Sequence, residues 1–458
     1  MNSNQLFRQV VRRTLTTKFV PRDRFQKRRL RRLLKQAKKN SPFYRELYKD
    51  IDLSQITPYN IAELPAVTKS QLIENYDDWV CDTDIHKEDV IEYASNIQNI
   101  GRLYLDEYYI TSTSGSTGEK LKVINEQKDF IEMLAMGAID TWPKLSYAID
   151  IAKSHRPVVY IAPTDGFYAS VLVSRAYMNL SDNFNSEIID FRVPTDELVL
   201  RLNQINPILI GGYVSTFLIL ADEAKAGRLN INVKYMVSIG TAYSEEDRQR
   251  VKEAFDCETF TSYSCTEAGE IGCEYVYGHY HLTKGVIVEP VDDNLNVIED
   301  GKESSGVLVT NLWNRSMPFI RYLLNDRCIV HNEQCKCGCK TKWIEVIGRE
   351  VIRVYFLNDD NKVIQMTDFM FEAILNDICS GKADHQMIID GNTIEMRFNI
   401  KNDFIKFSQF KRIRSRIQEL ANVNDLSLDV ALSDELPIVD NSGKTKRIII
   451  RQRKDVNK

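Results

Sequence analysis

The sequence lacks the features that mark membrane, secreted and nucleic-acid-binding proteins. No apolar run reaches the roughly 18 residues that a membrane-spanning helix requires. Arg8, Arg12 and Arg13 lie near the N-terminus, but no apolar core with a small-residue cleavage site follows them, so we expect no export. The formal net charge of -4 gives no global sign of nucleic-acid binding, and we expect no nucleic-acid partner.

An even set of cysteines is lacking as well. The chain has nine cysteines in 458 residues, whereas a disulfide framework is typical of short secreted chains with an even number. We therefore expect the protein to reside in the reducing cytoplasm. No internal repeat or low-complexity tract is present, and a chain of this length with 43% hydrophobic residues predicts about two or three globular units.

The first forty residues depart from the even charge balance of the chain. Asp23 is their only acid. The opposing basic residues include Arg22, Arg24, Lys27, Arg28, Arg29, Arg31, Arg32, Lys35, Lys38 and Lys39. Leu30, Leu33, Leu34 and Ala37 recur at helical spacing, and a basic amphipathic helix could lie on an anionic membrane or a carrier protein. We favour the other interpretation, in which the leucine stripe packs on the main body, because the stripe is narrow for a membrane anchor.

Short apolar runs alternate with polar helical stretches in the middle of the chain. The runs are Val158–Ile161, Ile208–Ile210 and Met236–Ile239, each bounded by proline or glycine, and Glu245–Phe255 has a helical pattern. Such runs are typical of buried parallel strands, although periodicity alone does not exclude short buried helices. The sequence therefore predicts an α/β body with a mostly parallel sheet.

The pattern changes after the Gly348-Arg349 junction. Polar turns at Asn358–Asn361 and Asp390–Asn392 each separate two apolar runs, which predicts two β-hairpins, and Phe404–Leu420 has a helical pattern. Strand pairs mixed with helices predict a separate small α+β domain. We therefore expect a basic helical segment (1–40), a large domain (41–347) and a small C-terminal domain (348–458).

A loop rich in serine, threonine and glycine follows an apparent strand at Tyr108–Ile110. It spans Thr111–Lys120, and its two glycines let the backbone approach an anion while hydroxyl and N–H groups donate to phosphate oxygens. Lys120 adds a point charge. The Walker A spacing is absent. The alternative is a flexible Ser/Gly linker.

Three further motifs are weak one at a time. Tyr263–Glu267 places a hydroxyl and a carboxylate at the end of a predicted strand, where they could bind a phosphate and its Mg²⁺. The alternative is a turn with capping residues. Pro318–Tyr322 is followed by Asp326, whose carboxylate suits two ribose hydroxyls; alone, this stretch reads as a surface strand and turn. Ser442–Arg447 carries a lysine directly after a glycine, and this lysine could reach a phosphoryl group and stabilise its negative charge. The alternative is a solvated basic tail.

Taken in order, these motifs resemble those of the adenylate-forming superfamily, which contains acyl-CoA ligases, peptide-synthetase adenylation domains and luciferases. The stretches Ser41–Tyr48 and Leu64–Lys69 are similar to the phenylacetate–CoA ligase branch, including members associated with capsular polysaccharide clusters. The resemblance runs from about Phe25 to Arg451. It implies a large N-terminal body that binds ATP and an acid, and a small domain that carries a catalytic lysine.

The resemblance also implies a role for each matching residue. The β- and γ-phosphates of ATP would be held by Ser114, Ser116, Thr117 and Lys120. The adenine would be bordered by Gly240, Thr241, Ala242 and Tyr263. Asp326 would bind the ribose, helped by Arg349. Among the catalytic residues, Thr266 would touch the α-phosphate, Glu267 would ligate Mg²⁺, and Lys444 would bridge the attacking carboxylate and the α-phosphate.

The implied reaction is attack of a carboxylate oxygen on the α-phosphorus, with release of pyrophosphate. Mg²⁺ and lysines must offset the repulsion between two anions. The acyl group would then pass to CoA or a carrier thiol after the small domain rotates. We expect a homodimer or a monomer. Phe167, Tyr168 and Tyr213, from the stretches 163–168 and 211–215, suggest a pocket for a flat or aryl acid.

A sulfur-rich stretch, Cys335–Cys339, suggests a structural metal. Cys273, His279 and His281 lie upstream, at the place corresponding to ligands in some members of this branch that bind zinc. The resemblance implies a tetrahedral Cys₃His zinc site made of Cys273, His281, Cys335 and Cys337, with Cys339 able to replace one of them. The alternative is a reduced turn with unliganded thiols.

Three departures from the family's pattern bear on the reaction. Relatives usually have glycine where this chain has Ser264 or Cys265, and often Gly-Glu where it has Gly240-Thr241. They commonly have an Asp pair after the Gly-Arg junction, where this chain has Glu350 and Val351, which bears on domain rotation and thioester formation. Two alternatives therefore stay open: an adenylyltransferase acting on a hydroxyl, and an inactive nucleotide-binding assembly protein.

Overall fold

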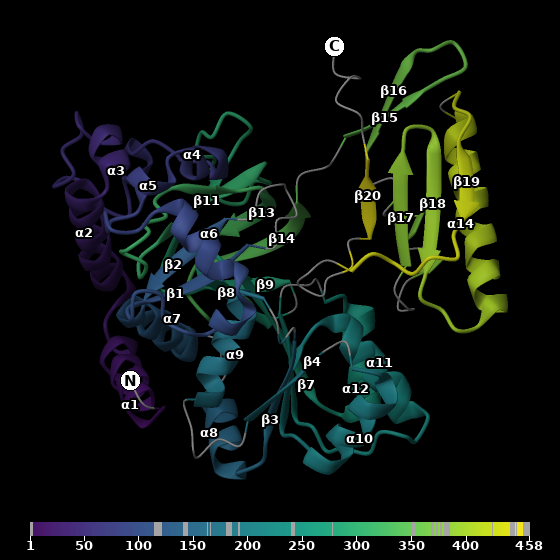
Figure 1. The fold of residues 1–458 in the computed structure, drawn as a ribbon, viewed down its shortest axis with the longest axis horizontal. Coiled ribbons are helices and arrows are strands. Elements are labelled where there is room, and N and C mark those ends of the chain that lie inside the picture. The colour runs from purple at the N-terminus through teal and green to yellow at the C-terminus, as the bar shows by residue number, and fades with distance from the viewer. Residues whose placement is uncertain are drawn as a thin grey trace. The chain divides into compact units, whose positions relative to one another are not determined.

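The computed structural model describes most of the chain, whose ribbon is drawn in Figure 1. The described residues are 3–113, 121–140, 145–162, 164, 166–179, 186–190, 193–239, 243–276, 278–349, 353–367, 371, 374–375, 378–379, 385–423, 425–439, 445 and 447–451. The chain divides into two compact units, Met1–Glu350 and Val351–Lys458.

Helices begin the first unit. They are α1 Ser3–Lys18, α2 Arg22–Asn40, α3 Pro42–Leu47, α4 Lys69–Glu74, α5 Tyr76–Trp79 and α6 Lys87–Ser95, with 3-10 helices at Ile61–Glu63 and Ile97–Asn99. The predicted leucine stripe lies on α2, where Leu30, Leu33 and Leu34 are at most 1% exposed and belong to the main core of the unit. The prediction that the stripe packs on the main body is therefore confirmed.

A nine-stranded sheet has the order β13-β14-β9-β8-β7-β6-β5-β3-β4. Its strands are β3 Val158–Ala162, β4 Ser186–Asp190, β5 Leu209–Gly212, β6 Tyr235–Ile239, β7 Glu258–Cys265, β8 Gly269–Val276, β9 His279–Leu282, β13 Asp326–His331 and β14 Trp343–Arg349. The strands from β7 to β4 are parallel, and those beyond β7 continue antiparallel. The three predicted apolar runs are β3, β5 and β6 of the parallel half.

Helices cover the parallel strands. They are α8 Leu145–Ser154, α9 Ala169–Asn179, α10 Thr195–Ile205, α11 Val214–Lys225 and α12 Glu245–Phe255. The α7 helix, Gln127–Asp140, packs instead against the antiparallel strand β8. Figure 1 shows α10, α11 and α12 gathered beside these strands, and they share one core with β3, β5 and β6. The α12 helix has the predicted bounds because Ser244 caps its start, accepting from the N–H of Asp247 at 3.1 Å. It ends at Asp256, whose φ is +47°.

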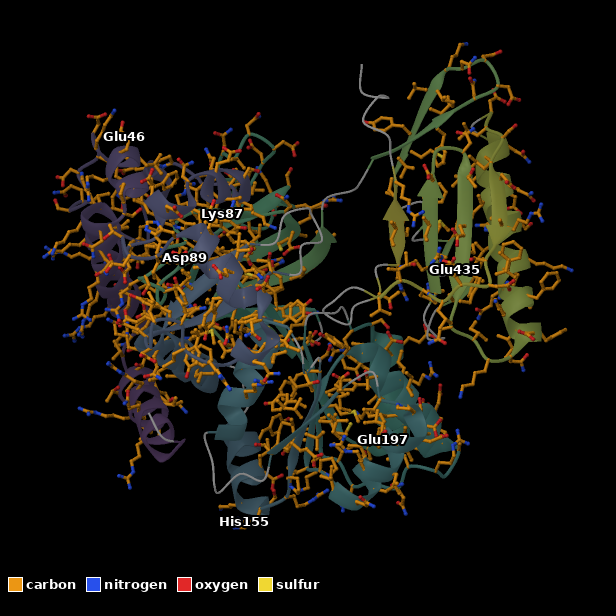
Figure 2. The ribbon with its side chains drawn as sticks, viewed as in Figure 1. Glu46, Lys87, Asp89, His155, Glu197 and Glu435 are labelled. Carbon is orange, nitrogen blue, oxygen red and sulfur yellow. The ribbon has the colours of Figure 1, made fainter. Side chains whose placement is uncertain are left out.

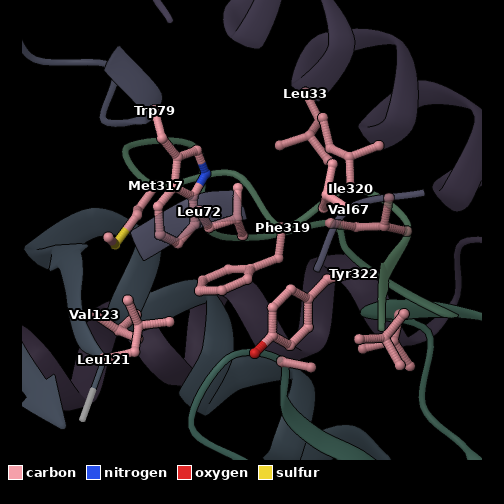
Figure 3. Packing of buried hydrophobic residues seen from close by; sticks show 14 of the residues in the cluster. Leu33, Val67, Leu72, Trp79, Leu121, Val123, Met317, Phe319, Ile320 and Tyr322 are labelled. Carbon is pink, nitrogen blue, oxygen red and sulfur yellow. The ribbon is translucent and has the colours of Figure 1, made fainter. Parts of the chain in front are cut away.

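Two smaller sheets complete the first unit. One is the hairpin of β1 Tyr108–Ser112 and β2 Lys122–Glu126, and the other joins β10 Val286–Val291, β11 Gly306–Asn311 and β12 Tyr322–Leu324. Their buried faces meet the N-terminal helices in the main core, part of which Figure 3 shows. There Phe319 packs edge-on against Trp79 and Tyr322, with ring centroids 4.9 and 5.2 Å apart.

The second unit has its own core. Its elements are β15 Arg353–Leu357, β16 Val363–Thr367, β17 His385–Asp390, β18 Thr393–Phe398, α14 Asp403–Val423, β19 Asp429–Leu432 and β20 Ile448–Ile450. The two predicted hairpins are the antiparallel pairs β15–β16 and β17–β18, and the predicted helix is α14. Phe356, Met387 and Ile413 are at most 1% exposed in the core between them. The predicted fold class, an α/β body with a small α+β part, is confirmed.

Candidate active site

The turn after β7 carries Thr266 and Glu267. It lies at the carboxyl end of a parallel strand, the edge at which open α/β sheets bind ligands. Gly269 follows with φ +68°, and a Cβ on it would lie 3.2 Å from side-chain atoms of Met133 and Trp313. Glycine alone suits this backbone and this space, so the turn has one defined shape.

Glu267 is held through both its backbone and its side chain. The Tyr322 hydroxyl donates to Oε1 at 3.0 Å, and Asn311 Nδ2 donates to the Glu267 carbonyl at 2.8 Å. Burial raises the pKa of Tyr322, so the hydroxyl keeps its proton and remains a donor. Glu267 is 8% exposed, and none of the described residues donates to its Oε2. Tyr322 thus positions one carboxylate oxygen, and the other has no hydrogen-bond donor among the described residues.

Tyr263 and Asp326 form a second tyrosine–carboxylate pair. The Tyr263 hydroxyl donates to Asp326 Oδ2 at 2.8 Å, and burial raises the pKa of Tyr263 well above its ordinary value. Asp326 begins β13 and is the register partner of Arg349 on β14. The residues predicted to lie at the adenine and the ribose are thereby joined, whereas the side chain of Arg349 is outside the described structure.

A chain of buried amides ties Glu267 to the β1–β2 hairpin. Asn311 Oδ1 accepts from the N–H of Asn314 at 3.0 Å, and Asn314 Nδ2 donates to Asn125 Oδ1 at 3.1 Å. Asn125 Nδ2 in turn donates to Thr111 Oγ1 at 3.3 Å. Asn311 and Asn314 have no exposed surface. An amide that is buried and fully paired holds its neighbours in one geometry, since breaking it leaves polar groups unsatisfied.

That hairpin carries the predicted phosphate-binding loop. The N–H of Thr113 donates to the carbonyl of Leu121 and the N–H of Leu121 donates to Thr113 Oγ1, both at 3.0 Å. These bonds close the base of the loop. The predicted phosphate ligands themselves, Ser114, Ser116, Thr117 and Lys120, lie outside the described residues.

Other predicted residues also lie outside the described part of the chain. They are Gly240, Thr241 and Ala242 at the adenine, and the catalytic lysine Lys444. The β6 strand ends at Ile239, directly before Gly240, and Ile239 pairs with Ser262 of β7. The backbone therefore enters the predicted adenine loop beside the strand end that carries Tyr263.

Three supporting residues were not predicted. Tyr322 was noted only as part of a motif, and Asn311 and Asn314 were not noted at all. The available signal was the pair of asparagines three residues apart that follows the largely apolar run Val307–Thr310.

The Pro318–Tyr322 stretch is buried, so its interpretation as a surface strand is wrong. Phe319 and Ile320 have no exposed surface, and Arg321, with φ +50°, is 4% exposed. Arg321 Nε donates to Glu289 Oε2 at 3.0 Å, and its Nη1 donates to the carbonyls of Ala62 and Leu64. A buried guanidinium with these partners anchors the loop.

A thiol–imidazole cluster lies beside the antiparallel half of the sheet. The ligand atoms of His281, Cys335 and Cys337 lie within 4.8 Å of one another, and His281 Nε2 is 3.3 Å from Cys337 Sγ. Burial lowers the pKa of His281 to about 4, so its imidazole is neutral, the form that binds metals. Its Nδ1 lies 3.1 Å from Thr341 Oγ1, which fixes the ring orientation.

The cluster has a tight backbone and a stacked wall. Gly338, with φ +86°, closes a turn in which its N–H donates to the carbonyl of Cys335 at 2.9 Å. His279 stacks on Trp343 with ring centroids 3.9 Å apart, and its Nδ1 lies 3.3 Å from Cys335 Sγ. Cys273 is the register partner of His281, yet it is not part of the three-residue group. Cys273 packs instead with a separate apolar cluster.

Among the described helices, none combines the length and the apolar character needed to cross a membrane. No family model matches the sequence, and no curated protein matches it either.

Solved structures with a similar fold are known. 2-Hydroxyisobutyryl-CoA ligase in the postadenylation state, in complex with 2-HIB-AMP, aligns with a TM-score of 0.61 and 17% identity over 93% of this chain and 89% of that one. The same ligase with 2-HIB-AMP and CoA in the thioesterification state aligns at 0.52 and 18% identity over 94% and 90%. The A-PCP structure of McyG complexed with phenylalanyl-adenylate aligns at 0.50 and 12% identity over 74% and 64%. The chain therefore has the fold of adenylate-forming enzymes.

Proposed function

We propose that the protein uses ATP to adenylate a small carboxylic acid and passes the acyl group to the thiol of CoA or of an acyl carrier. The observation that carries the proposal is the pair of tyrosine-held carboxylates, Glu267 and Asp326, near the carboxyl end of β7. They occupy a fold shared with ligases captured with an acyl-adenylate. Motifs matching that family provide the remaining groups.

In the proposed reaction, a carboxylate oxygen attacks the α-phosphorus and the bond to pyrophosphate breaks. Both reactants are anions, so the protein must supply positive charge where they meet. Lys444 is proposed to bridge the carboxylate and the α-phosphate, with Thr266 at the same phosphate. The loop of Ser114, Ser116, Thr117 and Lys120 is proposed to hold the leaving phosphates, while Gly240, Thr241 and Ala242 border the adenine and Arg349 assists Asp326 at the ribose.

Glu267 suits a magnesium ion. Its Oε2 is without a donor among the described residues, while Tyr322 holds Oε1, and Mg²⁺ prefers carboxylate oxygens combined with substrate phosphates. When bound, the ion would neutralise phosphate charge. Glu267 would therefore orient the metal through one oxygen while its other oxygen stays fixed.

The phenylacetate–CoA ligase-like branch is proposed from its N-terminal stretches. The Tyr44 hydroxyl donates to the carbonyl of Pro318 at 3.0 Å, and the N–H of Val67 donates to the carbonyl of Arg321 at 2.9 Å. Both stretches thus pack on the loop that precedes Tyr322. We propose a thiol acceptor on the same basis.

A flat or aryl acid is proposed from two buried aromatic residues, Phe167 and Tyr213, of which Phe167 lies beside the loop base. Phe167 and Tyr213 are each 7% exposed, and the carbonyl of Phe167 accepts from the N–H of Ser112 at 2.6 Å. We expect Phe167→Ala and Tyr213→Ala to change the order of preferred acids in a panel. Unchanged selectivity in both variants would contradict the aryl pocket without touching the adenylation proposal.

The test of the main proposal is ATP–pyrophosphate exchange with a panel of acids. We expect acid-dependent exchange by the wild-type protein and its loss in Lys444→Met, whereas the matched variant Lys446→Met keeps it. Nucleotide binding without exchange for any acid would favour an inactive module. A stable AMP-modified product would favour transfer to a hydroxyl.

A structural zinc ion is proposed for the thiol–imidazole cluster. Bond lengths of about 2.3 Å to sulfur and 2.0 Å to nitrogen put tetrahedral ligand atoms roughly 3.6 Å apart. The two sulfur–nitrogen separations of 3.3 Å are close to this spacing. His281, Cys335 and Cys337 would hold the ion, with His279 or Cys339 as the fourth ligand in place of Cys273.

Metal analysis separates these ligand sets. We expect about one zinc per chain in the wild type and in Cys273→Ser, and loss of zinc in Cys337→Ser. Comparing the zinc content of His279→Ala and Cys339→Ser identifies the fourth ligand, because only the variant that lacks this ligand should lose zinc. Full zinc in Cys337→Ser, or none in the wild type purified with zinc, would contradict the site.

A further inference from the structure

The α1 helix presents an apolar and basic face to solvent. Val11, Leu15 and Phe19 follow one another at four-residue spacing and are 37%, 57% and 82% exposed. That spacing places them on one side of the helix, with Phe19 directly after its last residue. Arg8 and Arg12 are both exposed, and they share that side because they stand three residues before Val11 and Leu15 respectively.

The α2 helix also presents basic side chains to solvent. Those exposed along its outer side are Arg24, Arg28, Arg31, Arg32, Lys35 and Lys39. Inward cations have partners: Arg29 pairs with Glu132, and Arg22 donates to the carbonyls of Leu282 and Thr283. The outward set forms no ion pair with any described residue. Figure 2 shows nitrogen-tipped side chains projecting from both helices, which lie along one edge of the first unit in Figure 1.

Acidic residues within the first forty positions do not balance this positive charge. The first forty residues hold 14 lysines and arginines against one acid, which gives them a formal charge of +13. The whole chain carries -4, so the remaining residues carry -17. Like charges three or four residues apart on a helix destabilise it, and a solvated helix face normally mixes both signs. An uncompensated stripe therefore indicates an anionic partner outside the chain.

We propose that the outer faces of α1 and α2 dock on an anionic lipid bilayer. Arginines interleaved with Leu15 and Phe19 suit the boundary between headgroups and acyl chains, where apolar side chains insert and cations meet lipid phosphates. The 19 residues of α2 form a row about 28 Å long, which fits an extended surface. A nucleic acid would use the cations but give the apolar side chains of α1 no place.

The experiment is sedimentation of the full chain with vesicles. Neutral phosphatidylcholine vesicles are compared with vesicles containing about 30% phosphatidylserine at two salt concentrations. The charge variant is Arg28→Glu with Arg31→Glu and Lys35→Glu, and the apolar variant is Leu15→Ser with Phe19→Ser. The matched control reverses three exposed basic residues of the second unit, with Lys401→Glu, Arg412→Glu and Arg414→Glu.

We expect the wild type and the control to sediment with phosphatidylserine vesicles and to remain unbound in the presence of neutral vesicles. The charge variant should bind at least about tenfold more weakly, and the apolar variant about fivefold, because each basic residue near such a surface and each inserted side chain contributes measurably. All variants should keep acid-dependent pyrophosphate exchange, which shows that they are folded. No binding to anionic vesicles, equal binding to neutral ones, or equal loss in the control would overturn the proposal. So would capture by RNA at these residues without vesicle binding.

Discussion

The two tyrosine–carboxylate pairs and the thiol–imidazole cluster satisfy their polar groups in different ways. Glu267 and Asp326 each accept from a tyrosine hydroxyl that the fold holds in place. In the cluster, the thiols of Cys335 and Cys337 face the imidazoles of His279 and His281. The comparison teaches that the fold itself supplies the hydrogen-bond donors of the first region, whereas the thiols and imidazoles of the second face one another, as the proposed zinc site requires.

Removing the charge of Glu267 should have the largest effect. Glu267→Gln should lower pyrophosphate exchange about a thousandfold, or about 4 kcal/mol, because a neutral amide binds Mg²⁺ much more weakly than a carboxylate does. Its thermal unfolding should be nearly unchanged, since Tyr322 can still donate. Glu299→Gln, at a well-exposed carboxylate, is the control. An exchange rate of Glu267→Gln within tenfold of the wild-type rate would show that Glu267 does not bind the metal.

Breaking the thiol–imidazole cluster should have the opposite effect, with a large loss of stability and little loss of activity. Cys337→Ser should lower the free energy of unfolding by about 3 kcal/mol through loss of the metal, yet leave exchange by the folded fraction within a few fold. Denaturant unfolding with and without a chelator measures this, with Cys81→Ser as a control outside the cluster. A chelator that leaves wild-type stability unchanged would show that no metal supports this region.

The amide chain should couple stability to activity. Asn311→Ala leaves the carbonyl of Glu267 and the N–H of Asn314 without their partner in a buried place, so we expect a loss of about 2 kcal/mol of stability. Exchange should fall about tenfold as the turn loosens. The exposed Asn296→Ala should do neither. Loss of stability with full exchange would show that the chain supports the fold alone.

The smallest effect is expected from the tyrosine hydroxyl. Tyr322→Phe deletes one hydrogen bond to Glu267, which should reduce exchange about fivefold, or about 1 kcal/mol. Tyr59→Phe removes a hydroxyl from a residue that is 76% exposed and should leave exchange unchanged. Equal rates in both variants would mean that the orientation of Glu267 does not depend on Tyr322.

The sequence predicted the parallel half of the large sheet more fully than the antiparallel half. Buried parallel strands are continuous apolar runs, as in Met236–Ile239, and the α12 helix carries its own cap at Ser244. The β9 strand, His279–Leu282, is short and polar, so periodicity gives no signal for it.

The same limit applies to the sites. Local motifs indicated Thr266 and Glu267, but the contact of Glu267 with Tyr322 joins residues 55 positions apart, which only the fold determines. Likewise, the resemblance to the ligase branch implied Cys273 as a ligand. The neighbouring register shift between Glu274 and Val276 and the packing of Cys273 in another cluster depend on the sheet.

The most direct measurement of the central claim is calorimetric titration of the wild type and of Asp326→Asn with a nonhydrolysable acyl-adenylate analogue. If Asp326, fixed by Tyr263, binds the ribose, the variant should bind at least about tenfold more weakly while unfolding at a similar temperature. Equal affinity of the two proteins, or no binding by the wild type, would contradict the nucleotide site.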